Sequence, residues 1–368
     1  FPYTTLFRSV VVVDRQPDAA LETSFANAAQ ISVSYCEPWA NREAPLKALK
    51  WMFDKEAPLL FRPQLDWDQW RWGLKFLAQC NDTAFERNVQ QIVALGAYSH
   101  AALKDLVVST GIEYNRLERG IAHFYTDQKS FDAAGHAVEL MRKFGVQRRL
   151  VSRDELLKIE PAFKAYGDKI TGGTYTSTDE SGDARVFTQE LARRCAARGA
   201  QFLYGHDVLR LNKIGDAIDS VAVIARNTGA GGQKDFILKA DAFVVACGSY
   251  SAPLLRTVGV DLPIYPGKGY SATFPLLKPE GAPMVSTIDD GKKIAMSRLG
   301  NVLRVAGTIE LGGFDMALDT PVAKARCHML SRRIEELFPG VCDTRTDEQG
   351  GNPQYWTGLR PATPTNIP

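Results

Sequence analysis

The residues Val10–Asp14, VVVVD, constrain the fold of this chain most strongly. A continuous apolar run of β-branched residues predicts a strand buried on both faces of a parallel sheet. An acidic residue at the end of such a strand is typical of a dinucleotide-binding unit, where it binds the ribose hydroxyls of an adenosine. A first strand, a glycine-rich turn and a helix should precede it, about thirty residues in all. Only nine residues precede this strand in the sequence, so the position of the phosphate loop is an open question.

The composition is that of an ordinary soluble globular protein and excludes several functional classes. The chain has 368 residues, 45% of them hydrophobic and 23% charged, with a formal net charge of +2. We expect two domains, or one large discontinuous domain. No dense Lys/Arg cluster indicates nucleic-acid binding. Apolar runs such as Ala242–Cys247 are far shorter than the roughly 18 residues of a membrane span, and no signal peptide is visible, so a cytoplasmic location is the default expectation.

The cysteine pattern indicates neither a metal site nor a redox disulfide. The six cysteines are scattered, without a CxxC pair or clustered histidines. We therefore expect them to be small buried hydrophobic residues. They are Cys36, Cys80, Cys195, Cys247, Cys327 and Cys342.

Helical and strand patterns alternate along the chain. Residues 37–110 are rich in tryptophan and helix formers and predict a helical insertion. Ser152 followed by Glu155 predicts a capping box for a short helix that stops near Pro161. A helix carrying Phe187, Leu191 and Cys195 on one face then ends at Gly199, and a strand follows at Gln201–Tyr204.

The second half predicts more strands. SVAVIARN and KDFILKA, separated by TGAGGQ, favour an antiparallel hairpin. Ala242–Cys247 predicts a continuous apolar strand that runs into Gly248 and a helix. A β-rich block over Leu262–Gly312 and a helix over Val322–Leu337 complete the pattern.

We therefore expect dinucleotide-binding strands at both ends and in the middle of the chain, with other material inserted between them. This favours an α/β (α+β mixed) fold in which a glutathione-reductase-like FAD-binding domain is interleaved with a substrate domain of sheet and helices. We assign residues 10–36, 150–255 and 340–368 to the cofactor domain. The substrate domain takes 37–149 and 256–339.

Small and polar residues follow the first strand and allow close approach of a pyrophosphate or a flavin. Asp14 is the predicted ribose ligand, although a solvated strand-end aspartate is as common and Arg15 could instead contact a 2′-phosphate. Thr23, Ser24, Asn27 and Ser32 supply hydrogen-bonding groups without bulk; a helix N-cap would explain one of them.

Two later segments add candidate site residues. Gly248 and Ser249 open a helix at the carboxyl edge of the expected parallel sheet, where ligands bind, although a plain strand-to-helix turn gives the same pattern. In WTGLRPATP, Gly358 and Pro361 constrain the backbone beside Arg360. A fixed guanidinium can bind a substrate carboxylate through two parallel hydrogen bonds.

Tyrosines and a lysine in PIYPGKGYS could line the same pocket. These are Tyr265, Lys268 and Tyr270, although aromatic packing explains the tyrosines equally well.

Several long segments together resemble the bacterial D-amino-acid dehydrogenase small subunit. They are AALETSFANAAQIS, PLKALKWMFDKEAPL, TGGTYTSTDESGDARVFTQELA, VVACGSYSAPLL, PIYPGKGYS, LRVAGTIELGGFD and YWTGLRPATP. That family belongs to the glycine oxidase and D-amino-acid oxidase group of FAD enzymes, and the similarity extends from Val10 to the last residue.

The resemblance implies FAD as the cofactor and oxidative deamination of D-amino acids, such as D-alanine, to 2-oxo acids and ammonia. It implies electron transfer to a quinone or another respiratory acceptor and a peripheral association with the inner face of the bacterial inner membrane. It places Arg360, Tyr265 and Tyr270 at the substrate. It also adds cofactor contacts from Ala28, Gln30, Ile31, Val208 and Gly358.

The chain departs from that family at several points. Ala29 replaces a glycine in ANAGQIS, which is tolerable only if the backbone there needs no positive φ. Ile121 replaces a small hydroxyl residue, so the resemblance does not determine which substrate side chain the protein prefers. Phe1–Ser9 have no family counterpart and can be translated from a common sequencing adapter, so we expect an artefact.

We also expect a fragment that lacks the GxGxxG loop and a terminal flavin-binding stretch. Two alternatives stay open: a glycine or sarcosine oxidase-like amine oxidase, and an inactive fragment that binds no flavin.

Overall fold

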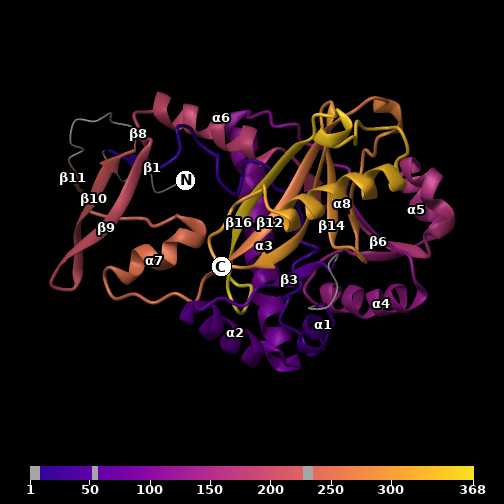
Figure 1. Cartoon of the computed structure of the whole chain (residues 1–368), viewed down its shortest axis with the longest axis horizontal. Helices are drawn as coiled ribbons and strands as arrows, with labels where there is room; N and C mark the ends of the chain where they lie inside the picture. Colours follow the sequence, from indigo (N-terminus) through magenta and orange to yellow (C-terminus); the bar gives the residue numbers. More distant parts are fainter. Residues whose placement is uncertain (1–8, 52–56, 227–234) are drawn as a thin grey trace.

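The structure, a computed structural model, describes residues 9–51, 57–226 and 235–368 (Figure 1). Its α-helices are α1 (Ala44–Trp51), α2 (Trp67–Gln79), α3 (Asp82–Thr110), α4 (Gln128–Lys143), α5 (Arg153–Ile159), α6 (Ala184–Ala197), α7 (Ser251–Arg256) and α8 (Pro321–Leu337). Short 3-10 helices are η1 (Pro161–Lys169), η2 (Gly248–Tyr250), η3 (Pro279–Gly281) and η4 (Asp347–Gln349).

The strands form one large sheet and three small ones. They are β1 (Val11–Asp14), β2 (Gln30–Ile31), β3 (Leu59–Phe61), β4 (Ile121–Tyr125), β5 (Arg149–Ser152), β6 (Gly172–Thr176), β7 (Glu180–Ser181), β8 (Gln201–Tyr204), β9 (His206–Ile214), β10 (Ala217–Ala225), β11 (Phe236–Lys239), β12 (Tyr265–Pro275), β13 (Ser286–Asp289), β14 (Ile294–Leu299), β15 (Val302–Leu311) and β16 (Gln354–Ala362).

The helix predicted to end at Gly199 and the strand predicted at Gln201–Tyr204 are confirmed, as α6 and β8. β1 and β8 pair in parallel, with Val11 opposite Gln201 and Asp14 opposite Tyr204. The helix before β8 is α6, and Gly199 follows it with φ +96°, a left-handed conformation that glycine adopts without strain. The sequence predicted α6 and β8 correctly because the residue pattern of each element lies within its own segment.

The antiparallel hairpin is also confirmed. β10 pairs with β11 and with β9 in a three-stranded sheet, which lies with β1, β8 and α7 at one end of the molecule (Figure 1). The predicted turn TGAGGQ falls in 227–234, outside the described residues.

The prediction of a strand at Ala242–Cys247 is wrong. The segment forms no strand, and Val244 and Cys247 in it are exposed. Within the described residues β1 pairs with β8 alone, so the segment has no sheet neighbour there. An apolar run becomes a strand only when another backbone accepts its hydrogen bonds.

The large sheet has nine strands in the order β16-β12-β15-β14-β13-β4-β6-β5, with β3 beside β15. Side chains alternate across it. On one face, Phe124, Tyr270 and Met296 pack into the main core with residues of α8 such as Leu330 (Figure 1). The predicted β-rich block and the predicted helix over Val322–Leu337 are both confirmed here.

The composition of this sheet differs from the predicted domain division. β5, β6 and β16 belong to it, although they come from 150–255 and 340–368, which the sequence analysis assigned to the cofactor domain. β16 lies beside β12, about ninety residues earlier in the chain. Such long-range pairing leaves no local signal in the sequence, so the predicted boundaries could not capture it.

Three helices, α1, α2 and α3, confirm the helical insertion in its described part, and the predicted cap of α5 is present. The Glu155 backbone N–H donates to Ser152 Oγ at 3.2 Å. The chain does not leave helical geometry at Pro161, because η1 begins there with proline in its first turn.

The prediction of buried cysteines holds for part of the set. Cys327 and Cys342 are buried, but Cys247 is exposed and the remaining three are half-buried. All six are free thiols.

Candidate functional site

Three segments that the sequence analysis singled out converge on one backbone carbonyl. Thr23 Oγ1 donates to the oxygen of Leu359 at 2.9 Å, and Ser249 Oγ donates to the same oxygen at 3.3 Å. Leu359 precedes Arg360 in β16. The loop after β1, the start of η2 and the WTGLRP strand therefore meet at this point, and the sequence alone did not identify Leu359 as their junction.

The carboxylate of Asp14, at the end of β1, can accept further hydrogen bonds. Asp14 Oδ1 accepts the backbone N–H of Gln16 at 2.8 Å, and no other hydrogen bond reaches its carboxylate from the part of the chain described. Burial raises the pKa of Asp14. Arg15 is not free for a 2′-phosphate, because it pairs with Glu22 at 2.7 Å and its guanidinium lies 3.8 Å from the centroid of the Tyr250 ring.

The loop that follows is fastened to the large sheet. Ser297 Oγ donates to the carbonyl of Ala28 at 2.8 Å, and Gln30 Nε2 donates to Ser286 Oγ at 2.8 Å. Ile31 pairs with Glu180 in the small β2–β7 sheet, and Ser32 Oγ donates to Asp179 at 2.9 Å. These side chains set the position of the loop, whereas Ser24 makes no hydrogen bond to another described residue.

Ala29 does adopt a positive φ, of 59°. Its N–H donates to Asn27 Oδ1 at 3.0 Å, and its carbonyl accepts the N–H of Gly182 at 2.9 Å. The condition under which alanine would fit this position without strain is therefore not met.

Arg360 lies on the face of the large sheet opposite α8. It is paired with Gly267 of β12, and a Cβ on neighbouring Gly269 would lie 3.1 Å from Arg360 Nε. These glycines leave room for the guanidinium. The loop carrying Ala28 and Gln30 is fastened to this same face, because Ser297 alternates with the core residue Met296 in β14.

The guanidinium of Arg360 has no hydrogen-bond or ion-pair partner among the residues that the structure describes. Burial lowers its pKa, and nearby Tyr35 acts in the opposite direction. Arg360 is half-buried, and a partly desolvated guanidinium without a partner is stabilised when an anion pairs with it. The position therefore suits a carboxylate ligand.

The two tyrosines predicted to share this pocket are committed to other contacts. Tyr270 lies on the α8 face and donates to Glu310 Oε2 at 2.6 Å. Tyr265 packs against Trp72 and donates to Asp66 Oδ2 at 3.1 Å. Burial raises the pKa of both phenols. Lys268 also points elsewhere, with Nζ donating to the carbonyl of Ala317 at 2.7 Å.

The remaining predicted residues are in backbone roles. Val208 lies in β9 opposite Val223 and packs with Val13. Gly248 begins η2 with φ +54°. Gly358 lies opposite Gly269, and a Cβ there would come within 2.0 Å of the Trp356 ring, so glycine is required.

Comparison with known proteins places this arrangement in a family. The family described as DAO, FAD dependent oxidoreductase, matches residues 6–368. The chain belongs to the FAD-dependent oxidoreductase family. The resemblance drawn from the sequence, the FAD cofactor and the α/β fold class are thereby confirmed.

Similar proteins agree with this assignment. The D-amino acid dehydrogenase of Dechloromonas aromatica (strain RCB) is 47% identical over 359 residues, which are 98% of this chain and 82% of that protein. The D-amino acid dehydrogenase of Granulibacter bethesdensis is 39% identical over 98% of this chain and 81% of that protein. Among solved structures, glycine oxidase from Geobacillus kaustophilus has a TM-score of 0.65 at 19% identity, covering 98% of this chain and 78% of its own. The structural likeness shows the fold.

The described residues fit parts of a bound FAD. The half-buried carboxylate of Asp14 suits the ribose hydroxyls, and the unpaired Ser24 offers a donor where the chain has little bulk. Arg185 Nε, close to the same loop, is buried without a partner, and its guanidinium lies 4.3 Å from the centroid of the Phe25 ring. Such an orphaned donor fits an anionic or carbonyl group of the cofactor.

Sequence reasoning missed Tyr35, His123 and Arg148, which lie on the same side of the sheet as Arg360. Burial raises the pKa of Tyr35, and its ring is 4.7 Å from that of His123 in an edge-to-face contact. The one available signal was a histidine within the otherwise apolar strand GIAHFY.

Proposed function

We propose that the protein oxidises D-amino acids such as D-alanine to 2-oxo acids and ammonia and passes the electrons to a respiratory acceptor, a quinone. Relatives named D-amino acid dehydrogenase at 39–47% identity support the substrate class. The observation that carries the proposal is the half-buried guanidinium of Arg360, which lies against glycines without an acidic partner among the described residues.

Arg360 binds the substrate carboxylate in this proposal. A guanidinium presents two parallel N–H groups to two carboxylate oxygens, which fixes the plane of the carboxylate and the direction of the α-carbon. Gly267 and Gly269 keep the sheet face open beside it. The low-dielectric surroundings strengthen this pairing relative to water.

The site requires no dedicated base. When the amine arrives neutral, its lone pair forms the C=N bond as the α-hydrogen leaves with its electron pair, and water then adds to the imine and releases ammonia. FAD, when bound, supplies the two-electron acceptor for that hydride. The protein contributes position and water exclusion.

A membrane contact is part of the proposal, because α2 carries an apolar stripe that faces solvent. Trp67 and Leu74 are 74% and 65% exposed, and Trp70 and Leu77 are also exposed at the same helical face. Tryptophan and leucine at this spacing suit the interface of a bilayer. Within the described residues, α3 is also long and apolar enough by composition to span a membrane, with 6% of its apolar window buried.

A comparison of electron acceptors tests the proposed function. The full-length enzyme should reduce dichlorophenolindophenol with D-alanine much faster than it releases peroxide, and it should use L-alanine poorly. Fast peroxide production from sarcosine would instead establish the glycine or sarcosine oxidase-like alternative.

A further inference from the structure

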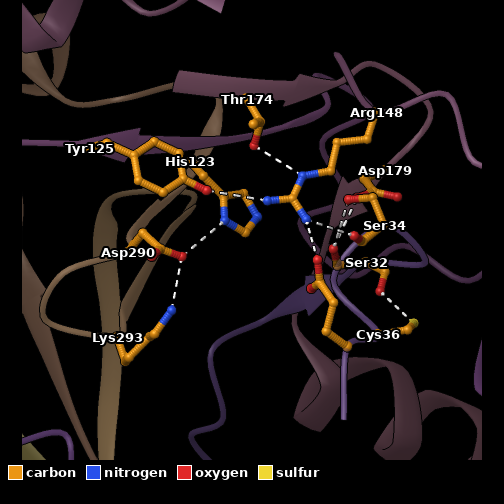
Figure 2. A network of polar contacts seen from close by, with 11 residues as sticks. Ser32, Ser34, Cys36, His123, Tyr125, Arg148, Thr174, Asp179, Asp290 and Lys293 are labelled. Carbon is orange, nitrogen blue, oxygen red and sulfur yellow. Dashed lines mark hydrogen bonds and ion pairs between the residues drawn. The ribbon is translucent and has the colours of Figure 1, made fainter. Parts of the chain in front are cut away.

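A partly buried cluster of polar side chains surrounds Arg148 and His123 (Figure 2). Arg148 is central: Nη1 pairs with Glu37 at 2.8 Å, and Nε donates to Thr174 Oγ1 at 3.1 Å. A second ion pair joins Lys293 Nζ to Asp290 Oδ1 at 2.9 Å. Each of these two ion pairs is neutral within itself.

His123 lies in this cluster, and the contact that Figure 2 marks for its ring is the one with Asp290. The residue is 1% exposed, and neither ring nitrogen has a hydrogen-bond partner. Asp290 Oδ1 is 3.9 Å from Nδ1, which is too long for a hydrogen bond. Leaving a buried polar group unsatisfied lowers the stability of the folded protein, so an imidazole in this state calls for an explanation.

The fold directs His123 toward the substrate side of the sheet. Its neighbour Phe124 packs against Phe163 in the core under α8, so alternation along β4 places His123 on the opposite face. Tyr35 covers the imidazole edge-on and also lies close enough to Arg360 to affect its pKa. Tyr35 is therefore the link between the carboxylate site and the cluster.

Lys293 has φ +54° in the tight turn that joins the antiparallel strands β13 and β14, where a left-handed residue is common. Here the Asp290 pair holds the Lys293 side chain against the cluster that contains His123.

The chemistry of His123 limits what it can recognise. Burial, and then the Arg148 cation, lower the pKa of His123 to about 4, so the ring is neutral at physiological pH. A neutral imidazole offers one donor and one acceptor. A hydroxyl or carboxamide matches both, whereas an aliphatic group leaves the ring unsatisfied.

We propose that His123 reads the substrate side chain, with Tyr35 moving aside, and that it selects D-amino acids whose side chain ends in a neutral hydroxyl or carboxamide. This inference rests on the proposed function. A site built to hydrogen-bond a substrate discriminates against an analogue that lacks the group, because its own polar atoms then stay unpaired.

Isosteric substrate pairs test the proposal in the full-length, FAD-loaded enzyme. We expect kcat/KM for D-threonine to exceed that for D-valine, or that for D-asparagine to exceed that for D-leucine, by about 10-fold or more, the equivalent of about 1.4 kcal/mol. His123→Leu should abolish or invert the preference, and His123→Gln, which retains a donor and an acceptor, should keep most of it.

The inference is overturned if the wild-type enzyme prefers the apolar member of both pairs, or if His123→Leu leaves the ratios unchanged. The wild-type ratios decide the matter even if His123→Leu does not fold. Anaerobic calorimetry with the same four amino acids, on enzyme whose FAD has been reduced beforehand with dithionite, measures recognition without oxidation, because the reduced flavin cannot accept a hydride. Tighter binding of the polar members without oxidation of any D-amino acid would reject the proposed function and support the role of His123.

Discussion

At the scale of single residues, the cofactor loop contains a strained alanine. Ala29 has φ +59° and is buried, with its N–H bonded to Asn27 and its carbonyl bonded to Gly182. Those two contacts and the pairing of β2 hold the backbone in a conformation that favours glycine. The left-handed conformation of Ala29, which helps to position the loop, therefore lowers the stability of the folded protein.

Replacing Ala29 with glycine should raise the free energy of unfolding by about 1 kcal/mol, since it removes the Cβ conflict of the left-handed conformation. Urea unfolding measures this change. Ala26→Gly is the matched control, because Ala26 is buried in the same loop without a positive φ, and it should destabilise. Equal destabilisation by both changes would contradict the account.

The buried imidazole of His123 predicts a specific pH dependence. Its pKa is lowered from 6.5 to about 4 by burial first and Arg148 second. Between these values the unfolded chain binds a proton that the folded protein does not, so stability falls as the pH drops from about 6.5 to about 4. Above about pH 6.5 the titration of His123 no longer changes the free energy of unfolding.

Comparing wild type with His123→Gln isolates this effect. Between pH 7 and pH 5 the wild type should lose about 2 kcal/mol more of its free energy of unfolding than the variant does. Urea titrations at the two pH values provide the measurement. Parallel losses in the two proteins would show that His123 does not carry the effect.

At the scale of elements, the sequence correctly predicted those helices and strands that depend on local residue patterns. α6, β8 and the β10–β11 hairpin were predicted because their periodicity and end signals lie within the segments themselves. The strand predicted at Ala242–Cys247 failed because strand formation also needs a paired neighbour, which a segment does not encode.

The site was predicted in its parts but not in its assembly. Thr23, Ser249 and Arg360 were separate candidates, and their junction at the Leu359 carbonyl follows from the pairing of β16 with β12. Tyr270 was misplaced because alternation along β12 turns it toward α8. His123 offered only one polar residue in an apolar strand, too little to indicate a site.

The exposed stripe of α2 predicts how the protein meets a membrane. The double variant Trp67→Ser/Leu74→Ser should reduce co-flotation with anionic liposomes at least several-fold, because it removes the apolar area that would enter the interface. Leu209→Ser, an exposed apolar position on β9, is the matched control and should float like wild type. Undiminished flotation of the double variant would remove α2 from the contact.

At the scale of the whole molecule, the large sheet separates two functions. One face packs on α8 and forms the main core. The other carries Arg360 and His123 and receives the loop that follows β1, through Ser297 and Gln30. The cofactor loop and Arg360 therefore share one sheet face, although they come from opposite ends of the described chain.

The central claim is that Arg360 binds the carboxylate of an amino acid on that face. The most direct measurement is the KM for D-alanine of Arg360→Met beside that of Arg360→Lys in the full-length, FAD-loaded enzyme. Loss of the paired, charge-assisted hydrogen bonds should raise KM by about 100-fold in the methionine variant and less in the lysine variant, with the flavin absorbance unchanged. A KM in Arg360→Met equal to that of the wild type would contradict the claim.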